Sequence, residues 1–420
     1  SHVNLSGVGC PEMGSLLLMP TTGELNVDYH HYGSKYEKET ASPGYYSLQL
    51  TKYNIKVEAT STLRTGLTRF TFPKGKSHIL MNLGEGLTNE SGAYLRRINN
   101  REIEGMKFLG TFCYNPQAVF PIYFVMRINK APKQTGYWKF QRKMTGVEAE
   151  WDKDNGKYKL YTQYDRDLAG DDIGAWFTFD TEENEQIEVA VGVSFVSMEN
   201  ARQNLEAEQH GAGFDEIYAS SRKRWNDDLS RITVEGGTKE QKTVFYTALY
   251  HTLIHPNILQ DVNGEYPAME TGETKTTKNN RYTVYSLWDT YRAAHPLYTI
   301  LIPKRVPGMI NSLLDYQKVQ GHLPVWTLWD KETYCMIANH AVPVVVDAYL
   351  KGFKGFSPED AYNAIKASLT VSHKKSDWET YDKYGYYPFD ITTVESVSRT
   401  LESAYDDYCA AQMAKAMGKD

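Results

Sequence analysis

The sequence predicts a multidomain β + α protein, in which an N-terminal β-sandwich is followed by a linker helix and then by part of an (α/α)6 toroid. Three observations predict this fold class. Short apolar runs with a period of two dominate up to about residue 196, one amphipathic helix follows them, and helical patterns with capping signals continue to the end. Strands followed by helices are typical of separate β and α regions. The change of period predicts a β-sandwich domain at 1–212, a helical linker at 213–237 and an incomplete helical domain at 238–420.

The composition limits the possible functions. The chain has 420 residues, of which 41% are hydrophobic and 23% are charged; this is ordinary for a globular protein and long enough for two domains. The net charge is −6 and the basic residues are scattered, so we expect no nucleic-acid surface. The sequence contains no run of about 18 apolar residues, so no membrane span is predicted. The 31 Tyr residues suit partly wet binding surfaces, although large β-sandwiches are also rich in them.

The strands of the first region are predicted from alternation. In the run at 44–63, Tyr46, Leu48 and Leu50 fall on one face, and polar and apolar side chains alternate again at 67–73. Runs rich in β-branched and aromatic residues, separated by Gly, Asn, Asp and Pro, are typical of a sandwich. Further strands are predicted at 16–19, 78–83, 119–128, 175–180 and 186–197.

The linker helix is predicted at 213–232, where apolar side chains recur at helical spacing. Its predicted buried face consists of Phe214, Ile217, Tyr218, Trp225, Leu229 and Ile232. Gly236 and Gly237 end this segment. Thr238 and Gln241 then have the spacing of a capping box, which predicts the start of the next helix.

Later helices are predicted at 303–320, at 341–350 and after a Ser357 cap. A second capping box, at 392–395, is expected to open a long last helix. Its predicted inward face consists of Val394, Val397, Leu401, Tyr405 and Tyr408. Asp406 and Asp407 fall on the same helix; one of them could turn inward, but we expect a solvated or capping role. The chain opens inside a turn-like segment and ends without a closing element, so we expect an internal portion of a longer protein.

The most informative stretch for function is YTVYSLWDTYRAAHPLYTILI, at 282–302. It places Trp288, Asp289 and Arg292 at the beginning of an apolar helix. An indole offers a stacking face, and a carboxylate and a guanidinium offer directional hydrogen bonds, which together suit a polyhydroxylated ligand. The alternative is a local ion pair between Asp289 and Arg292 with Trp288 packed in a core.

Seven blocks of the chain resemble glycoside hydrolase family 92, the calcium-dependent exo-α-mannosidases, in the order in which that family has them. The blocks are HVNLSGVGCPEMG (2–14), EATSTLRTGLTRFTFP (58–73), VGVSFVSMENARQNL (191–205), FYTALYHTLIHPNI (245–258), YSLWDTYRAAHPL (285–297), KETYCMIANHAVPVVVDAYLKG (331–352) and YYPFDITTVESVSRTLESAYDDYCAAQMA (386–414). The resemblance implies a β-sandwich, a linker and an (α/α)6 barrel, with the active site between the two domains. It also implies inverting release of terminal α-linked mannose from glycans, assisted by calcium.

The resemblance does not extend to the catalytic carboxylates. The family places its general acid in a segment like E-G-N-x-W-Q and its base in a Gly-Asn-Asp segment, and this sequence contains neither. We therefore assign no catalytic acid, no base and no calcium ligand to this chain. The family's order would place both carboxylates after residue 420.

Six residues are carried over as candidates for substrate binding. Asp289 is expected to accept hydrogen bonds from mannose hydroxyls, with Trp288 and Arg292 beside it. Glu332 and His340 belong to a second block of the same kind, although Glu332 could instead cap a helix and His340 could be a satisfied core histidine. Cys10 lies in the first block, near the expected site.

Three functions remain open from the sequence. The first is an exo-acting α-mannosidase that acts on mannose-containing glycans and is secreted, periplasmic or bound to the cell surface. The second is a non-catalytic mannose- or glycan-binding protein on the same scaffold, which the missing carboxylate segments favour. The third is another toroidal glycosidase or phosphorylase, which the WDTYR and ETYCMIANHA blocks oppose.

Overall fold

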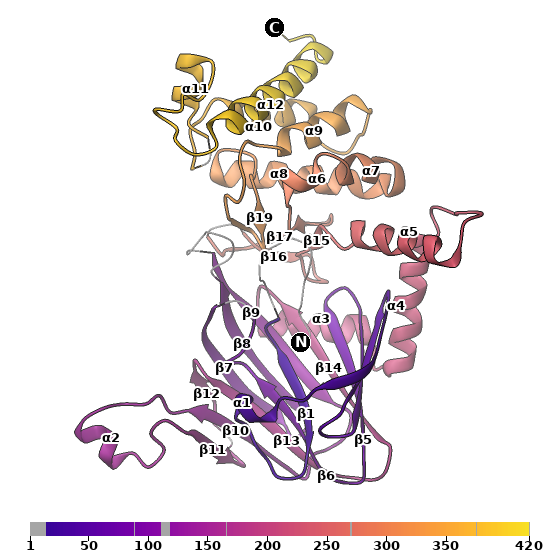
Figure 1. The fold of residues 1–420 in the computed structure, drawn as a ribbon, viewed down its shortest axis with the longest axis vertical. Coiled ribbons are helices and arrows are strands. Elements are labelled where there is room, and N and C mark those ends of the chain that lie inside the picture. Colours follow the sequence, from indigo (N-terminus) through magenta and orange to yellow (C-terminus); the bar gives the residue numbers. More distant parts are fainter. Residues whose placement is uncertain are drawn as a thin grey trace.

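The computed structural model describes residues 14–87, 89–110, 118–164, 166–268, 271–374 and 376–419. A β-rich half contains the earlier part of the chain, and a helical half lies against one end of its strands (Figure 1). The predicted fold class is confirmed. The predicted boundaries at 212 and 237 stay predictions, although strands end at Ser194 and helices dominate afterwards.

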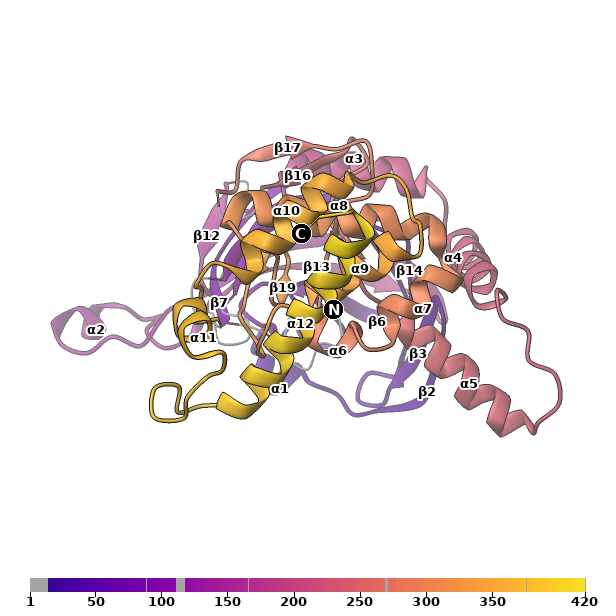
Figure 2. The ribbon, with the colours of Figure 1, turned by 90° about the horizontal axis from the view of Figure 1, so that it is seen from above.

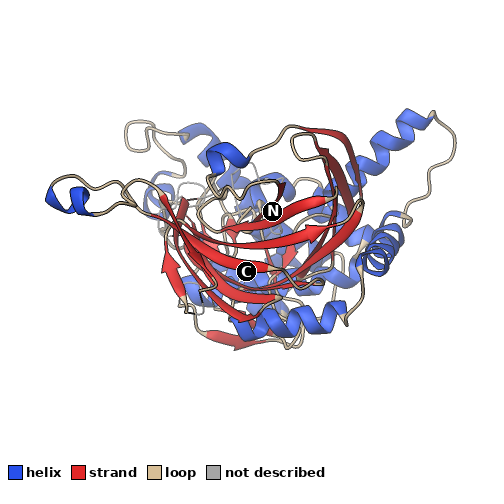
Figure 3. Cartoon of the chain, turned by 90° about the horizontal axis from the view of Figure 1, so that it is seen from below, coloured by secondary structure: helices blue, strands red, loops and turns tan. Residues whose placement is uncertain are grey.

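In the described part of the chain, the β-rich half consists of two antiparallel sheets, one of five strands and one of nine. In spatial order the smaller sheet contains β1 (Leu17–Thr22), β6 (Gly75–Asn82), β13 (Ile173–Thr181), β10 (Gln134–Phe140) and β11 (Tyr158–Thr162). The larger contains β12 (Leu168–Gly170), β7 (Asn89–Asn99), β8 (Glu102–Gly110), β9 (Val119–Ile128), β14 (Glu185–Ser194), β5 (Thr65–Phe72), β4 (Ile55–Ser61), β3 (Tyr45–Leu50) and β2 (Tyr36–Ser42). Figure 3 shows the strands from below.

The space between the sheets is filled by the alternate side chains that the period-two pattern places on one face. Ile79 and Phe177 of the smaller sheet are buried in one cluster with Phe70, Phe124 and Val189 of the larger one. The predicted strands are confirmed, and β9 has the predicted bounds. The run at 186–197 ends earlier because the Ser197 side chain accepts a hydrogen bond from the backbone N–H of Asn200 and begins a helix.

Helices α3 (Met198–Gln209), α4 (Phe214–Leu229) and α5 (Lys239–Thr252) connect the two halves. The predicted linker helix is confirmed as α4. Its Phe214 and Ile217 pack on Leu67 of β5. The capping box that begins α5 is confirmed by the reciprocal bonds between Thr238 and Gln241. Two short helices lie in the β-rich half, α1 (Tyr29–Tyr32) and α2 (Val147–Trp151), and α2 projects from the sandwich on a long connection (Figures 1 and 2).

The helical half is an arc of helices above the sandwich (Figure 2). It contains α6 (Leu287–Thr290), α7 (Ala294–Leu301), the 3₁₀ turn η1 (Pro303–Arg305), α8 (Val306–Gln320), α9 (Ala341–Leu350), α10 (Pro358–Leu369), α11 (Trp378–Tyr384) and α12 (Ser396–Ala416). Three two-stranded ladders join its loops: β15 (Asn257–Ile258) with β18 (Tyr282–Thr283), β16 (Glu265–Pro267) with β17 (Thr274–Thr276), and β19 (Thr327–Leu328) with β20 (Lys331–Glu332). One core, including Leu313, Val345 and Met413, joins α8, α9 and α12. None of the helices in the described ranges is long and apolar enough to cross a membrane.

The prediction for the last helix is wrong in two respects. The residue before α12 is Glu395 in a left-handed conformation, with no side-chain cap bond, so the expected capping box does not form. The five residues predicted to face inward are all exposed. The buried stripe instead contains Asp406, Cys409 and Met413. The helical period was predicted correctly, but the more apolar stripe of α12 is exposed, and packing against α9 buries the stripe that contains Cys409 and Met413.

Two features hold the halves together. A hydrophobic cluster joins Leu109 and Phe120 at the ends of β8 and β9 to Trp326 and Leu328 in a loop of the helical half. Beside it, the buried carboxylate of Asp261 accepts hydrogen bonds from three donors on the sandwich side. The donors are Ser194 Oγ (2.6 Å), Asn200 Nδ2 (2.8 Å) and Asn204 Nδ2 (2.6 Å). Because a buried carboxylate needs such partners, this contact fixes one position of the loop on the sandwich.

Candidate functional site

Trp288 lies on α6, a single helical turn that ends before α7 begins. The predicted continuous apolar helix is therefore broken, with Ala293 in a non-helical conformation at the junction. The Trp288 ring is half-buried against the hydrophobic cluster between the two halves. Its indole Nε1 donates a hydrogen bond to Glu402 Oε2 of α12 at 2.9 Å. The ring is thus held in one orientation at the junction of the sandwich and the helices.

Arg292 lies over this ring instead of pairing locally with Asp289. Its guanidinium carbon is 4.4 Å from the centroid of the Trp288 ring and 4.9 Å from that of Tyr291. Arg292 Nε donates to the Trp288 carbonyl at 3.0 Å, and a terminal nitrogen lies 4.0 Å from Glu402 Oε1. Cation–π contacts and a backbone bond therefore position the guanidinium.

Asp289 is exposed, and within the described part of the chain its carboxylate has no hydrogen-bond partner. Crowding by neighbouring atoms raises the pKa of Asp289, and the nearby Arg292 charge opposes that shift. A carboxylate with open acceptor positions beside a fixed aromatic ring is suited to accept hydrogen bonds from ligand hydroxyls.

His340 precedes α9 and is buried between two carboxylates. Its Nδ1 lies 3.0 Å from Asp406 Oδ1 and its Nε2 lies 2.7 Å from Glu402 Oε2. A neutral imidazole has only one N–H, so two hydrogen bonds to ionised carboxylates require the imidazolium. Burial alone would lower the pKa of His340, but the two carboxylates outweigh it and raise the pKa above its ordinary value. The ring also stacks on Tyr291, with centroids 4.1 Å apart.

The network continues through Asp406, which is buried and accepts a hydrogen bond from the backbone N–H of Asn339 at 2.8 Å. The expectation of a solvated or capping Asp406 is therefore wrong. Glu402 was not predicted as a site residue at all. The sequence does contain a signal for both. Glu402 and Asp406 are four residues apart and share a helical stripe with Cys409 and Met413, and acids in a buried stripe need partners.

Glu332 has a structural role in its own loop. Its buried carboxylate accepts hydrogen bonds from the backbone N–H groups of Val325 (2.8 Å), Trp326 (2.9 Å) and Tyr334 (2.9 Å). The interpretation of Glu332 as a helix cap is wrong, and these three bonds direct its carboxylate into the loop. The same loop contains five non-glycine residues with left-handed backbone: Trp329, Asp330, Tyr334, Met336 and Ala338. Such strain is maintained only where the surroundings hold it, and it is common at ligand sites.

Two expectations remain, the contact of Cys10 with the site and the binding of calcium. Cys10 lies outside the described residues, and its proposed contact with the site stays a prediction. In the ranges that the structure describes, no group of three or more His, Cys, Asp and Glu side chains could hold a metal ion. The carboxylates of Glu402 and Asp406 are instead used by His340 and Trp288.

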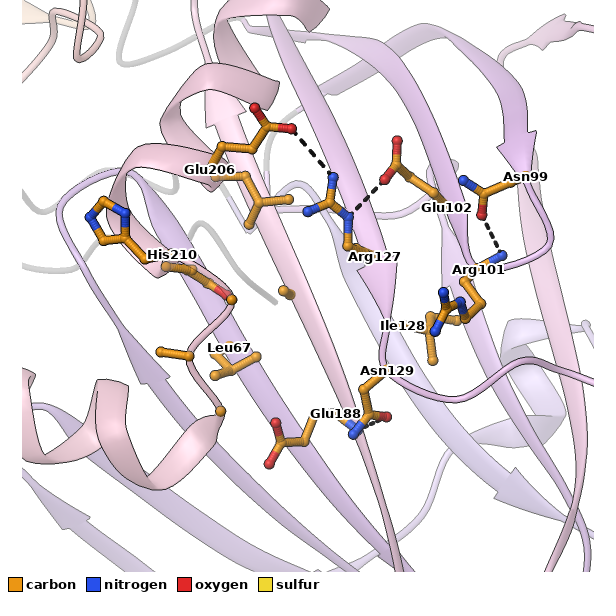
Figure 4. A pocket seen from close by; sticks show the side chains of 16 residues that line it. Leu67, Asn99, Arg101, Glu102, Arg127, Ile128, Asn129, Glu188, Glu206 and His210 are labelled. Carbon is orange, nitrogen blue, oxygen red and sulfur yellow. Dashed lines mark hydrogen bonds and ion pairs between the residues drawn. The ribbon is translucent and has the colours of Figure 1, made fainter.

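A hollow of about 570 Å³ lies elsewhere, on the nine-stranded sheet beside α3 and the turn into α4 (Figure 4). Its charged groups largely neutralise one another: Arg127 pairs with Glu102 at 2.7 Å and approaches Glu206 at 3.7 Å. No Tyr, Trp or Phe is among its described lining residues. It lacks the stacking surface that the Trp288 site has.

Models of two domains of one known protein family match the chain. Residues 1–194 match the model of the glycosyl hydrolase family 92 N-terminal domain, and residues 200–420 match that of the family 92 catalytic domain. The chain belongs to glycoside hydrolase family 92.

Solved structures and a curated relative agree with membership of family 92. A family GH92 α-mannosidase from Bacteroides thetaiotaomicron is 34% identical with a TM-score of 0.88, over 99% of this chain and 55% of that chain. Its complex with mannoimidazole gives a TM-score of 0.89. An inverting family GH92 mannosidase from the same organism is 27% identical with a TM-score of 0.84, over 97% of this chain and 53% of that one. A protein of Arthroderma benhamiae described as an uncharacterized secreted glycosidase is 25% identical over 100% of this chain and 53% of its own. The family 92 chain described here thus spans about half the length of these relatives.

Proposed function

We propose that this chain forms the sandwich and part of the helical domain of an exo-acting α-mannosidase, which releases terminal α-linked mannose from glycans with inversion. The proposal is supported by family 92 membership and by the mannoimidazole complex of a similar α-mannosidase. The observation on this chain that carries it is the arrangement at α6. There an oriented guanidinium lies over a fixed indole, and the next residue of the chain after this Trp has an exposed carboxylate, at the junction of the two halves.

Each of these groups has a role in the proposal. The Trp288 ring provides a surface for the apolar face of a sugar, and Asp289 accepts hydrogen bonds from its hydroxyls. Arg292 donates to the same sugar while remaining stacked on the ring. Glu402 and the imidazolium of His340 keep the indole in place, so that the sugar meets a preorganised surface.

Inversion requires a carboxylic acid and a carboxylate base roughly 6.5–9.5 Å apart, with a water between the base and the sugar. We assign neither role to a residue of this chain, because its sequence lacks both family segments. Calcium is part of the proposal as the family's cofactor. Since the described residues form no cluster of three or more acidic, His or Cys side chains, we derive no step through it. A secreted, periplasmic or cell-surface location is proposed from the relative that is described as secreted.

The test is mannose release from α-linked manno-oligosaccharides, with the anomer of the product followed by NMR. We expect Asp289→Asn to lower kcat/KM by about tenfold or more, because a charged hydrogen-bond acceptor to the sugar is lost. Thermal stability should be unchanged, since Asp289 is exposed and its side chain has no hydrogen bond to lose among the described residues. Full activity in Asp289→Asn, or release of a different sugar, would overturn the assignment.

A second candidate is a non-catalytic glycan-binding protein on the same scaffold. The observation that favours it is the arrangement of Trp288 and Arg292, which requires no catalytic group to bind a sugar. It predicts that mannose binds and that Asp289→Asn weakens the binding, with no mannose released at any calcium concentration.

A further inference from the structure

A groove with a volume of about 1170 Å³ separates the upper part of the nine-stranded sheet from helices α4 and α5. Its size exceeds that of a typical pocket for a small ligand, which is about 300–1,000 Å³. None of its lining residues comes from the five-stranded sheet, and none belongs to the Trp288 network. The groove is therefore distinct from the site proposed above.

The floor of the groove is made by small side chains in register. Tyr46 of β3 pairs with Ala59 of β4, and Ala59 pairs with Thr68 of β5. One step along, Ser61 pairs with Gly66. Toward the other end of the same strands, the larger side chains of Val57 and Phe70 pack in the sandwich core. The groove forms where these large side chains give way to small ones. Tyr46 stands at its side as a half-exposed aromatic ring.

The opposite wall is one face of α5. Lys239, Lys242, Thr243, Tyr246, Thr247, Tyr250 and His251 all line the groove. Their spacing is that of a single helical stripe, while Phe245 and Leu249 on another face of the helix pack in the core of the helical half. From α4, Trp225 joins this wall, and its ring meets that of Tyr250 with centroids 4.7 Å apart at 60°.

The aromatic rings have fixed positions but retain open hydrogen-bonding groups. Tyr46 donates to Glu39, and the Tyr246 hydroxyl donates to the carbonyl of Ile232 at 3.0 Å. By contrast, among the described residues neither the Trp225 indole N–H nor the Tyr250 hydroxyl has a hydrogen-bond partner. Aromatic faces with unused polar tips are suited to ligands that are apolar on one face and hydroxylated at the edges.

The charges of the lining narrow the class of ligand. The lining side chains that can carry charge are all basic (Lys239, Lys242 and His251), so the groove opposes cations and accepts neutral or acidic molecules. An entirely apolar ligand would bury the ammonium groups of Lys239 and Lys242 against a surface with no hydrogen-bond acceptor. We infer that this groove is a second, non-catalytic glycan site, which binds an oligosaccharide segment by stacking on Trp225 and Tyr250. It goes beyond the proposed function because it requires no hydrolysis and no contact with α6.

The indole N–H groups provide separate reporters for the two sites. In a ¹H–¹⁵N spectrum of the protein titrated with a neutral α-linked mannotetraose, the Trp225 signal reports the groove and the Trp288 signal reports the α6 site. Each signal is assigned by its Trp→Phe variant. We expect both signals to shift. A shift of the Trp288 signal alone would refute the second site. A shift of the Trp225 signal alone would support the second site and contradict the proposed function.

Variants provide the affinity test, which is read by isothermal titration calorimetry because Trp225→Ala removes its own indole signal. We expect Trp225→Ala to weaken oligosaccharide binding at the groove by about tenfold or more, because truncation of an aromatic anchor usually lowers affinity at least that much. The matched control is Trp151→Ala, since Trp151 is 86% exposed on the projecting α2 and should change nothing. Thr247→Arg fills the groove from an exposed position on α5, so it should block binding without loosening the core. Equal affinity in Trp225→Ala, Thr247→Arg and Trp151→Ala would refute the inference, as would a Trp225 signal that responds to unglycosylated peptide but not to oligosaccharide.

Discussion

Replacement of His340 by Ala tests the network behind Trp288. The change leaves Asp406, which is only 1% exposed, with a single backbone N–H donor and no counter-charge. Glu402 is 21% exposed, so water can partly replace its lost bond. Breaking a buried ion pair from one side typically costs about 3–5 kcal/mol, and the Asp406 side should dominate that loss. We therefore expect His340→Ala to lower the free energy of unfolding by about 3–5 kcal/mol.

The assay is equilibrium denaturation in urea, followed by circular dichroism. The matched control is His31→Ala, because His31 also pairs with an aspartate, Asp28, at 2.7 Å but is 69% exposed. Such a surface pair contributes about 0–1 kcal/mol. A loss in His340→Ala no larger than that in His31→Ala would refute the reasoning.

The pH dependence of the same measurement has a definite sign. The pKa of His340 is raised in the folded protein, so its charged form is favoured by folding. The stability that it contributes is fully present below the ordinary pKa of histidine, about 6.5, and is lost as the pH rises through the raised folded value. The difference between wild type and His340→Ala should therefore shrink on going from pH 6 to alkaline pH. A difference that grows over this range would contradict the imidazolium assignment.

Three further predictions follow from the other contacts. Glu332→Ala should lower the free energy of unfolding by about 3 kcal/mol or more in urea denaturation, because three backbone N–H groups, two of them buried, lose their acceptor; Glu332→Gln, which keeps one oxygen, should cost less. Asp261→Ala should speed amide exchange in the loop around residue 261, measured by mass spectrometry, since Ser194, Asn200 and Asn204 lose their shared acceptor; unchanged exchange would show that the hydrophobic cluster alone holds the loop. If calcium assists mannose release as proposed, a chelator should abolish the activity and added calcium should restore it, and activity that survives chelation would remove calcium from the proposal.

Local patterns in the sequence were enough to predict much of the fold. Alternation around Phe70 and Val189 predicts strands because one face of each must be buried, whichever partner buries it. The capping box at Thr238 is equally local, since both of its bonds join residues within one turn. These features need no knowledge of distant parts of the chain.

The wrong prediction for the buried face of α12 and the missed partners of Trp288 depend on distant contacts. Leu401 and Asp406 lie on different faces of one helix, and hydrophobicity alone favours burial of Leu401. The structure buries Asp406 because His340, 66 residues earlier in the chain, provides a charged partner. Likewise, the tie between Trp288 and Glu402 spans 114 residues, so no local pattern could predict it. The sequence singled out the candidate residues at 288–292, whose role in sugar binding stays a prediction, but it did not identify the groups that orient them.

The hydrogen bond between Trp288 of α6 and Glu402 of α12 also determines how much of the chain the proposed sugar site needs. Trp288, Asp289 and Arg292 lie within five consecutive positions, which invites transfer of this short motif to another scaffold. Yet the indole takes its orientation from Glu402, which in turn shares His340 with Asp406. A shortened protein that stops before α12, or a graft of residues 287–292 alone, would keep all three side chains that we propose to bind sugar and lose the groups that orient them. The recognition unit therefore extends from residue 288 to at least residue 406.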